Sequence, residues 1–174
     1  MNHFREEPAM SKYLTALLLA LATVSGFSHA APVEQPGDGD KALFISNVTT
    51  APTYNLGMFL NDKTMAYGTL RIISSDGDSA FGIGGGVRMY QERKSPLRTF
   101  FDANLMISSV DGVEDSFGIG GYFGAEYLAA KNVSIGAKVG ATFSNVSPDA
   151  PGPAGDSYTV LDIGVAEVML NFYF

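Results

Sequence analysis

The sequence predicts an all-β protein, an eight-stranded antiparallel up-and-down transmembrane β-barrel that follows an export signal. Three observations lead to this prediction. Apolar and polar residues alternate with period two through segments that are separated by turn residues. Aromatic residues on the apolar face fall mostly at the ends of these segments, and the last segment finishes on Phe174. An apolar run near the N-terminus precedes a small-x-small tripeptide.

The N-terminal run has the form of a signal peptide. Lys12 precedes an apolar stretch over 14–22, and Ser28-His29-Ala30 matches a signal peptidase site. The run is shorter than the roughly 20 apolar residues of a membrane-spanning helix, although a retained N-terminal anchor helix is the alternative. Met10 is an alternative start to Met1, because residues 1–8 add acid where a signal needs positive charge. We therefore assign 1–30 to a cleaved signal, 31–40 to a flexible periplasmic leader rich in Pro and Gly, and 41–174 to the barrel.

Cleavage at this site would leave a mature chain without the side chains that several kinds of chemistry require. Both histidines, His3 and His29, lie in the removed part, and the chain has no Cys and no Trp. Disulfides, thiol chemistry and histidine-based catalysis or metal ligation are thereby excluded. Removal takes away two basic and two acidic residues, so the net charge stays at −7. Nucleic acid is not an expected partner, because phosphate binding needs a basic face.

The alternation places eight strands. We expect them near 41–48, 54–60, 64–74, 80–92, 98–109, 116–128, 133–145 and 158–174. An even number puts both chain ends on one side, the periplasmic side. The connections at 61–63, 94–96 and 130–132 are tight and would be periplasmic, whereas those at 74–79, 110–115 and 146–157 are longer and would face outward.

The sixth and seventh segments carry the clearest alternation. Phe117, Ile119, Phe123 and Tyr127 share one face of the sixth, opposite small or polar residues, and the seventh repeats the pattern from Val133 to Phe143. The same pattern describes a soluble barrel with its apolar face inside.

The aromatic residues decide between a membrane barrel and a soluble, lipocalin-like barrel. In strands of alternating direction, Phe81, Phe117 and Phe143 fall at the outer rim, and Phe101, Tyr127, Phe172 and Phe174 fall at the inner rim. Phe117 and Tyr127 are separated by about 25 Å along a tilted strand, the height of a lipid-facing band. Phe123 is the exception at mid-height. A soluble barrel has no reason to sort its rings into two belts, so the membrane barrel is favoured.

The stretch FGIGGYFGAEYLAAKNVSIGAKVGATFS and the terminal NFYF resemble the small eight-stranded outer-membrane barrels of the OmpA, OmpX and opacity-protein type. The last strand, with Leu170, Phe172 and Phe174, is similar to the C-terminal assembly signal of such proteins. This resemblance implies a Gram-negative outer-membrane location, contact with outer-membrane lipid and lipopolysaccharide, and recognition by the barrel-assembly machinery. Two departures weaken the transfer of a loop-borne binding role: the first two strands are short with blurred alternation, and the outer loops are short.

Charged residues are predicted inside the barrel. The inward set comprises Arg71, Arg88, Arg98, Asp102, Glu126, Lys138, Asp162 and Glu167. Hairpin register would bring Arg88 near Asp102 and Arg98 near Glu126. An eight-stranded barrel has little room beyond its side chains, so paired charges would plug it. The alternative is a proton or small-ion path, helped by inward glycines at 82, 84, 86, 118, 120, 124, 136 and 140.

The outward connections are acidic and contain no Lys or Arg. Asp-Gly pairs at 76–77 and 111–112 are good turn formers and need no ligand. The carboxylates could instead hold Ca²⁺ or Mg²⁺ shared with lipopolysaccharide phosphates. No segment has EF-hand spacing, so we predict no metal site and no cofactor.

Three classes of function follow. We favour a structural or surface-interaction role in the cell envelope, with a narrow channel as the alternative. A lipid-modifying enzyme is the third class, but the mature chain lacks the histidine of a serine–histidine mechanism and offers no other nucleophile–base pair. Asp102 and Glu126 could act on a glycan as acid and base, yet nothing in their spacing singles them out. We therefore predict that the protein is not an enzyme.

Overall fold

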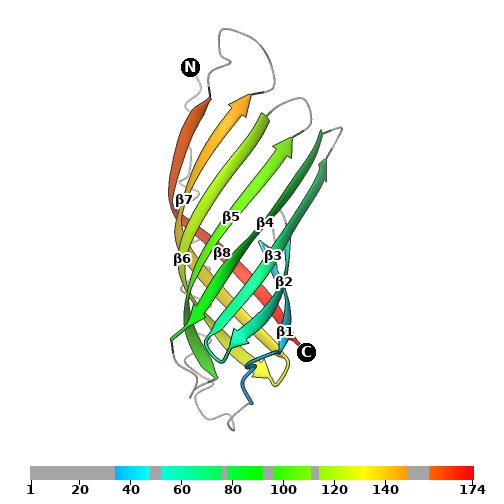
Figure 1. Ribbon diagram of the computed structural model, residues 1–174, viewed down its shortest axis with the longest axis vertical. Helices are drawn as coiled ribbons and strands as arrows, with labels where there is room; N and C mark the ends of the chain where they lie inside the picture. Colours follow the sequence, from blue (N-terminus) through cyan, green and yellow to red (C-terminus); the bar gives the residue numbers. More distant parts are fainter. Residues whose placement is uncertain (1–33, 48–51, 76–77, 92–95, 111–113, 149–156) are drawn as a thin grey trace, which may run out of the picture. The chain divides into compact units, whose positions relative to one another are not determined.

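The computed structural model describes residues 34–47, 52–75, 78–91, 96–110, 114–148 and 157–174. These residues form a closed barrel in which each strand pairs antiparallel with the next and β8 pairs with β1 (Figure 1). The predicted eight-stranded up-and-down barrel is confirmed. Within the described residues, no helix is long and apolar enough to cross a membrane. The strands are β1 Lys41–Ser46, β2 Thr53–Asn61, β3 Thr64–Ser75, β4 Asp78–Tyr90, β5 Leu97–Val110, β6 Glu114–Ala130, β7 Val133–Pro148 and β8 Tyr158–Tyr173.

The barrel has a terminal end and a loop end. The terminal end holds Lys41 and Tyr173, and the loop end holds the β3–β4, β5–β6 and β7–β8 connections. The β5–β6–β7 ladder extends further toward the loop end than the sequence predicts, because polar residues there, such as Ser109 opposite Asp115, still pair. In contrast, β1 ends two residues early, since Asn47 has a φ of 55°, which is incompatible with an extended strand.

The first two strands alternate regularly between buried and more exposed residues. In β2 the inward positions Thr53, Asn55, Gly57 and Phe59 are buried and the intervening residues are exposed. The inward set mixes an aromatic residue with small and polar ones, which is why the pattern looks blurred in the sequence. Whether a side chain faces the lumen or the exterior is therefore set by its position along the strand rather than by its hydropathy alone.

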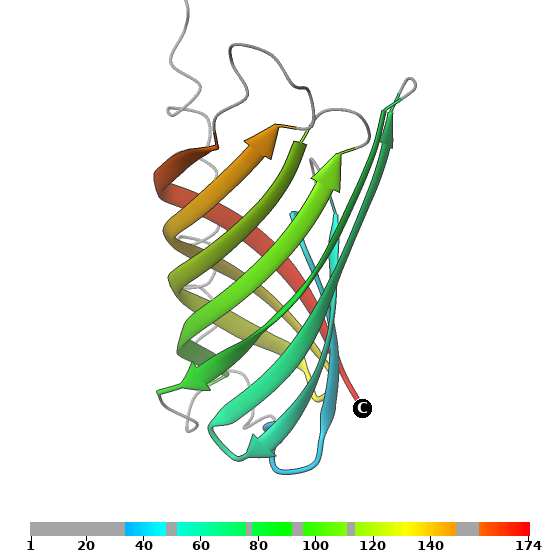
Figure 2. The ribbon, with the colours of Figure 1, turned by 45° about the horizontal axis from the view of Figure 1, so that its top comes forward.

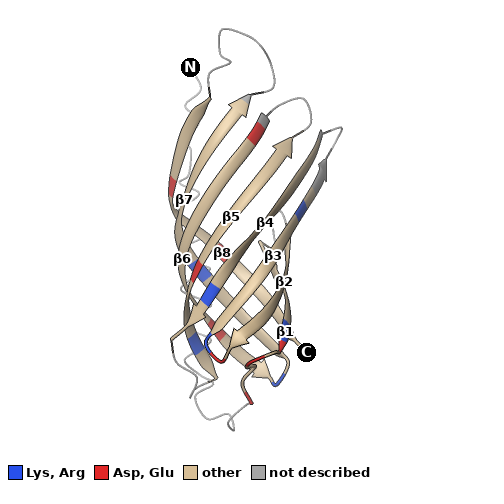
Figure 3. Ribbon diagram, viewed as in Figure 1, with Lys and Arg blue, Asp and Glu red and all other residues tan. Residues whose placement is uncertain are grey.

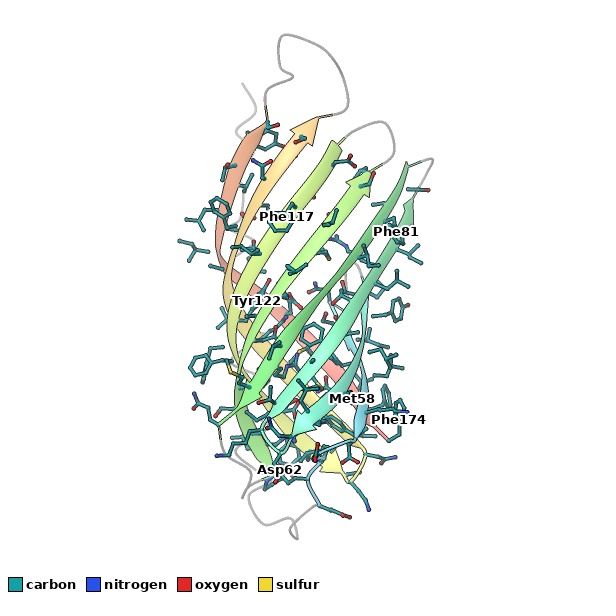
Figure 4. The ribbon with its side chains drawn as sticks, in the orientation of Figure 1. Met58, Asp62, Phe81, Phe117, Tyr122 and Phe174 are labelled. Carbon is teal, nitrogen blue, oxygen red and sulfur yellow. The ribbon has the colours of Figure 1, made fainter. Side chains whose placement is uncertain are left out.

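Large apolar side chains cover the outside of the barrel. Phe81 and Phe117 project outward toward the loop end, and Met58 and Phe174 project outward at the terminal end (Figure 4). Between them lie exposed Leu, Ile and Val side chains, and Phe101 packs against Phe123 with ring centroids 5.3 Å apart. This apolar surface continues around the strands, which is the arrangement of a barrel whose solvent is hydrocarbon.

The wall of the barrel is incomplete at the loop end. β1 pairs with β8 only over Met169–Tyr173, and β2 pairs with β3 only as far as Arg71. Residues 158–167 of β8 and 72–75 of β3 therefore continue past β1 and β2, which stop far below the other strands (Figure 2). We call the resulting opening, bounded by Ser46, Thr53 and these two strand segments, the wall notch.

The core lies inside the barrel near the terminal end. Its buried apolar side chains come mainly from β1–β5 and β8, and include Phe44, Phe59, Tyr67, Tyr90 and Phe100. A turn over 37–40 closes against this end, where the N–H of Gly39 donates to the carbonyl of Phe59 at 3.0 Å. The flexibility expected of the 31–40 leader stays a prediction.

Candidate functional site

Most of the charged positions that the sequence places inside the barrel lie in its terminal half (Figure 3), where their side chains form ion pairs. Arg88 of β4 stands opposite Asp102 of β5 in the strand register, and its Nε lies 2.9 Å from Asp102 Oδ2. Both side chains are fully buried. The other carboxylate oxygen of Asp102 accepts a hydrogen bond from the Tyr67 hydroxyl at 2.6 Å. The carboxylate is therefore held at both oxygens.

A second pair lies one strand further on. Arg98 of β5 stands opposite Glu126 of β6, with a guanidinium nitrogen in direct contact with Glu126 Oε1. The carboxylate of Glu126 also accepts hydrogen bonds from the Tyr173 hydroxyl at 2.9 Å and from the Asn171 amide at 3.0 Å. These donors come from β8, so they tie the β5–β6 hairpin to the strand that closes the barrel.

Lys138 of β7 completes the network. Its Nζ lies 3.4 Å from Glu167 Oε2 and 3.7 Å from Asp102 Oδ1. Arg88 also approaches Glu126, with 3.9 Å between Nη1 and Oε2, so the pairs join into one cluster. Three cations face three carboxylates here: Arg88, Arg98 and Lys138 against Asp102, Glu126 and Glu167. A neutral, closely coupled set of this kind avoids leaving an isolated charge in a low-dielectric interior.

Aromatic rings enclose the two guanidinium groups. The Cζ of Arg88 lies 4.5 Å from the ring centroid of Phe44 and 4.3 Å from that of Phe100. Arg98 lies 4.4 Å from the Tyr90 ring centroid. Contacts of this geometry are worth about 0.5–2 kcal/mol each, more where water is excluded. The rings also fill the space between the charged groups, which closes this part of the lumen.

Inward glycines make room for these rings. A Cβ on Gly124 would overlap the ring of Phe100, and one on Gly86 would overlap the ring of Tyr67. Gly140 likewise leaves room for Tyr122. In the alternative prediction of an ion path, these glycines would widen the lumen. In the structure the space beside each of these three is occupied by an aromatic ring.

Two residues of the predicted charged set lie outside the cluster. Arg71 points inward between Thr53 and Gly82 in the register, nearer the loop end. Asp162 stands opposite Thr142 because a bulge at Gly164, with a φ of 83°, shifts the alternation of β8, and its side chain is exposed. Neither makes an ion pair within the described residues. The cluster therefore holds six of the eight.

Several contributors were not recognised from the sequence. Tyr67, Ser134, Asn171 and Tyr173 supply hydroxyl and amide partners, and Phe44 supplies a ring. Each occupies an inward position in the alternation, and that period-two signal could have placed it inside. The alternation does not show which inward residues contact one another, because the partners of Glu126 lie up to 47 residues away in sequence.

The loop half of the lumen differs in character. A cavity of about 310 Å³ lies there, with Tyr122, Lys138 and Glu167 among its lining residues. Hydroxyl and amide side chains dominate the rest of the lining, together with Arg71; they include Ser46, Thr53, Asn55, Thr69, Asn104, Ser108, Ser116, Thr142 and Ser144. The lumen is thus packed at one end and lined by a polar cavity at the other.

The remaining predicted features lie at the ends of the barrel. Phe172 and Phe174 project outward beside β1, and the backbones of Phe174 and Lys41 exchange hydrogen bonds. Lys131, in the β6–β7 turn, lies 2.5 Å from an exposed Glu34 oxygen, a contact that raises the pKa of Lys131. Most acidic residues of the outward connections lie outside the described residues or have side chains that are not described. Among the residues that are described, no group of three or more His, Cys, Asp or Glu could hold a metal ion.

Solved structures that are similar to this chain include those of two bacterial proteins. The N-terminal β-barrel domain of Pseudomonas aeruginosa OprF matches 80% of this chain and 100% of its own, with 14% identity and a TM-score of 0.49. Neisserial surface protein A matches over 77% of this chain and 90% of its own, with 17% identity and a TM-score of 0.40. No family model matches the chain, and no curated protein matches it.

Proposed function

We propose that the chain is an integral outer-membrane β-barrel protein of Gram-negative bacteria, with a structural or surface-interaction role in the envelope. Its exposed apolar surface supports placement in a bilayer, since a water-soluble domain would bury such side chains. Lipid and lipopolysaccharide would surround the wall, and the barrel-assembly machinery would recognise the strand that ends at Phe174.

One observation carries the assignment of a non-conducting role. The terminal half of the lumen is filled by ion pairs and rings, and Arg88, Arg98 and Glu126 are each at most 1% exposed. A conducting path needs a continuous line of water, and none could pass fully packed side chains without displacing them. The packing supports a closed lumen over the narrow channel that is the alternative.

Planar-bilayer recording tests the closed lumen. Purified, refolded protein should give no conductance steps at any applied voltage, while an open porin in the same bilayer gives steps and controls for insertion. Regular steps from the refolded barrel would favour the channel instead.

Cell fractionation tests the location. The mature protein should be recovered with outer membranes and should migrate faster on a gel when it is not boiled, because folded barrels resist detergent. Recovery as a soluble periplasmic monomer would contradict the proposed placement.

A deletion strain tests the envelope role. Loss of a structural barrel should raise sensitivity to detergent and to large antibiotics, and a plasmid copy of the gene should restore resistance. Unchanged sensitivity under both stresses would count against the structural role.

A further inference from the structure

We propose that the wall notch and the polar cavity beside it form a binding site for an amphiphile with an anionic head and a hydrocarbon chain, entered sideways from the bilayer. This inference rests on the membrane placement proposed above. The head would occupy the cavity, and the chain would leave through the notch into the surrounding lipid.

The notch is a real interruption of the wall. One hydrogen-bonded row runs from Ser46 and Thr53 through Arg71 and on to Tyr158 of β8, and β3–β7 all continue beyond it toward the loop end. The missing strands leave β3 and β8 about 14 Å apart, which is three inter-strand spacings. Along the barrel axis the open edge is about 10 Å long on β3 and about 25 Å long on β8. Within the described residues no strand fills this space.

The cavity opens at the base of the notch. Ser46, Asn47 and Thr53, which end the two short strands, are among its lining residues. The opposite side is lined by β5 and β6, through Asn104, Ser108 and Ser116. A volume of about 310 Å³ is at the lower end of the range for small-ligand pockets, which is enough for a head group but not for a whole lipid.

Arg71 gives the cavity its charge preference. The other two charged lining residues, Lys138 and Glu167, neutralise one another at 3.4 Å. Arg71 has no ion pair within the described residues, and its Nε is buried without a hydrogen-bond partner. A buried guanidinium donor without a partner is costly, and a carboxylate or phosphate oxygen would satisfy it.

The edges of the notch suit the chain of such a molecule. Ile72 of β3 and Leu161 and Ile163 of β8 project outward beside it, and Ile163, at 80%, is the most exposed large apolar side chain of the described residues. Within the described residues, the notch-facing backbone edge of 159–167 has no strand partner, and an open edge at membrane depth is tolerated only where it is buried in protein or lines a water-filled cavity. The notch therefore joins a polar pocket to an apolar exterior, which is what an amphiphile requires.

Quenching by spin-labelled fatty acid tests the site. The chain has no Cys, so Ile163→Cys at the notch and Ile119→Cys on the far wall can each carry one fluorophore on the lipid-facing surface. The full chain is placed in phosphatidylcholine nanodiscs at alkaline pH and titrated with doxyl-stearate. Quenching should be several-fold stronger at 163 than at 119. The methyl ester of the same fatty acid, which has no charge, should quench both positions alike.

Cavity variants in the Ile163→Cys background connect the quenching to Arg71. Arg71→Gln and Arg71→Glu should raise the half-quenching concentration about tenfold or more, as expected for loss of a charge-assisted contact. Arg71→Lys should retain part of the binding, and Thr142→Phe, which fills the cavity, should remove it. Lys63→Gln takes one positive charge from the terminal end and should change nothing. Doxyl-labelled lysophosphatidic acid, compared with doxyl-stearate, distinguishes a lipid phosphate from a free carboxylate as the head.

The outcomes separate this site from the proposed membrane placement. Equal quenching at 163 and 119, equal quenching by the methyl ester, or quenching that persists in Arg71→Gln and Thr142→Phe would overturn the site alone. A protein that never enters nanodiscs and shows no heat-modified migration would overturn the membrane placement and the site with it.

Discussion

Arg88 and Asp102 face one another across the β4–β5 hairpin, with the guanidinium Nε 2.9 Å from the carboxylate Oδ2 and neither side chain exposed to solvent. The two residues are paired in adjacent strands, so their contact is local in sequence. Side chains from other strands cover the pair and exclude solvent from it. Tyr67 of β3 and Lys138 of β7 reach the same carboxylate from other parts of the wall. The pair therefore links hairpin formation to closure of the barrel.

The first prediction concerns this pair. Asp102→Ala leaves Arg88 buried beside an unbalanced cluster, and removal of one partner from a buried pair typically costs about 3–5 kcal/mol. Arg88→Ala should be similarly destabilising. The double variant keeps Arg98 with Glu126 and Lys138 with Glu167, so part of the loss should be recovered. Urea unfolding of refolded barrel in lipid measures all three free energies of unfolding.

An exposed ion pair provides the control for this cycle. Lys131 and Glu34 lie 2.5 Å apart with side chains 73% and 72% exposed, so removing either should leave the free energy of unfolding almost unchanged. Equal effects at the exposed and buried pairs would mean that the charge cluster does not stabilise the barrel.

The second prediction tests which face meets lipid. Ile119 projects outward at mid-strand in β6, and Arg at this position should cost about 2–4 kcal/mol in a bilayer. Ser144 of the neighbouring β7 lines the polar cavity, so Ser144→Arg should cost far less. The same urea experiment compares them. The reverse ranking would indicate that the apolar face is the interior and that the barrel is soluble.

The third prediction concerns the glycines that make room for rings. Gly124→Ala places a methyl group against Phe100 and should destabilise the barrel by about 1–3 kcal/mol. Gly121→Ala, on the outer face of the same strand, meets nothing within 4 Å and should be neutral or slightly stabilising. Unfolding free energies that do not distinguish the two variants would contradict the packing described for Phe100.

The fourth prediction concerns assembly. Phe174→Asp keeps the backbone hydrogen bonds with Lys41 but removes an aromatic ring that is 66% exposed. If the ring is part of a C-terminal recognition element, outer-membrane levels should fall sharply in pulse-labelled cells. Leu60→Asp removes an apolar group from the outer face at the same end and is the matched control. An equal fall in both variants would assign the effect to lost lipid contact rather than to recognition.

The period-two alternation was sufficient to predict the architecture. Each of the eight strands overlaps its predicted segment, and the inward or outward facing of residues such as Arg88 and Ile119 follows from position alone. Contacts between the two strands of a hairpin can also be predicted from the sequence, because tight turns fix the register of neighbouring strands. The sequence therefore predicts Arg88 beside Asp102 and Arg98 beside Glu126.

The ends of the strands and the bulge in β8 could not be predicted from the alternation. The early end of β1 at Asn47 is a backbone conformation that hydropathy does not report. The bulge at Gly164 places Asp162 opposite Thr142, an inward residue, whereas strict alternation from Glu167 would put Asp162 on the outer face. The local sequence pattern therefore predicts the strands, but it does not predict the wall notch that the short strands β1 and β2 leave.

The sequence by itself determined the strand number, the facing of most side chains and the hairpin ion pairs, because these depend on period and on neighbouring register. Only the tertiary structure decided that Tyr173 and Asn171 reach Glu126, that Phe44 and Phe100 enclose Arg88, and that Arg71 stands apart beside a notch. Barrel closure and strand tilt bring distant residues to one level of the lumen, and neither quantity is encoded in any single segment.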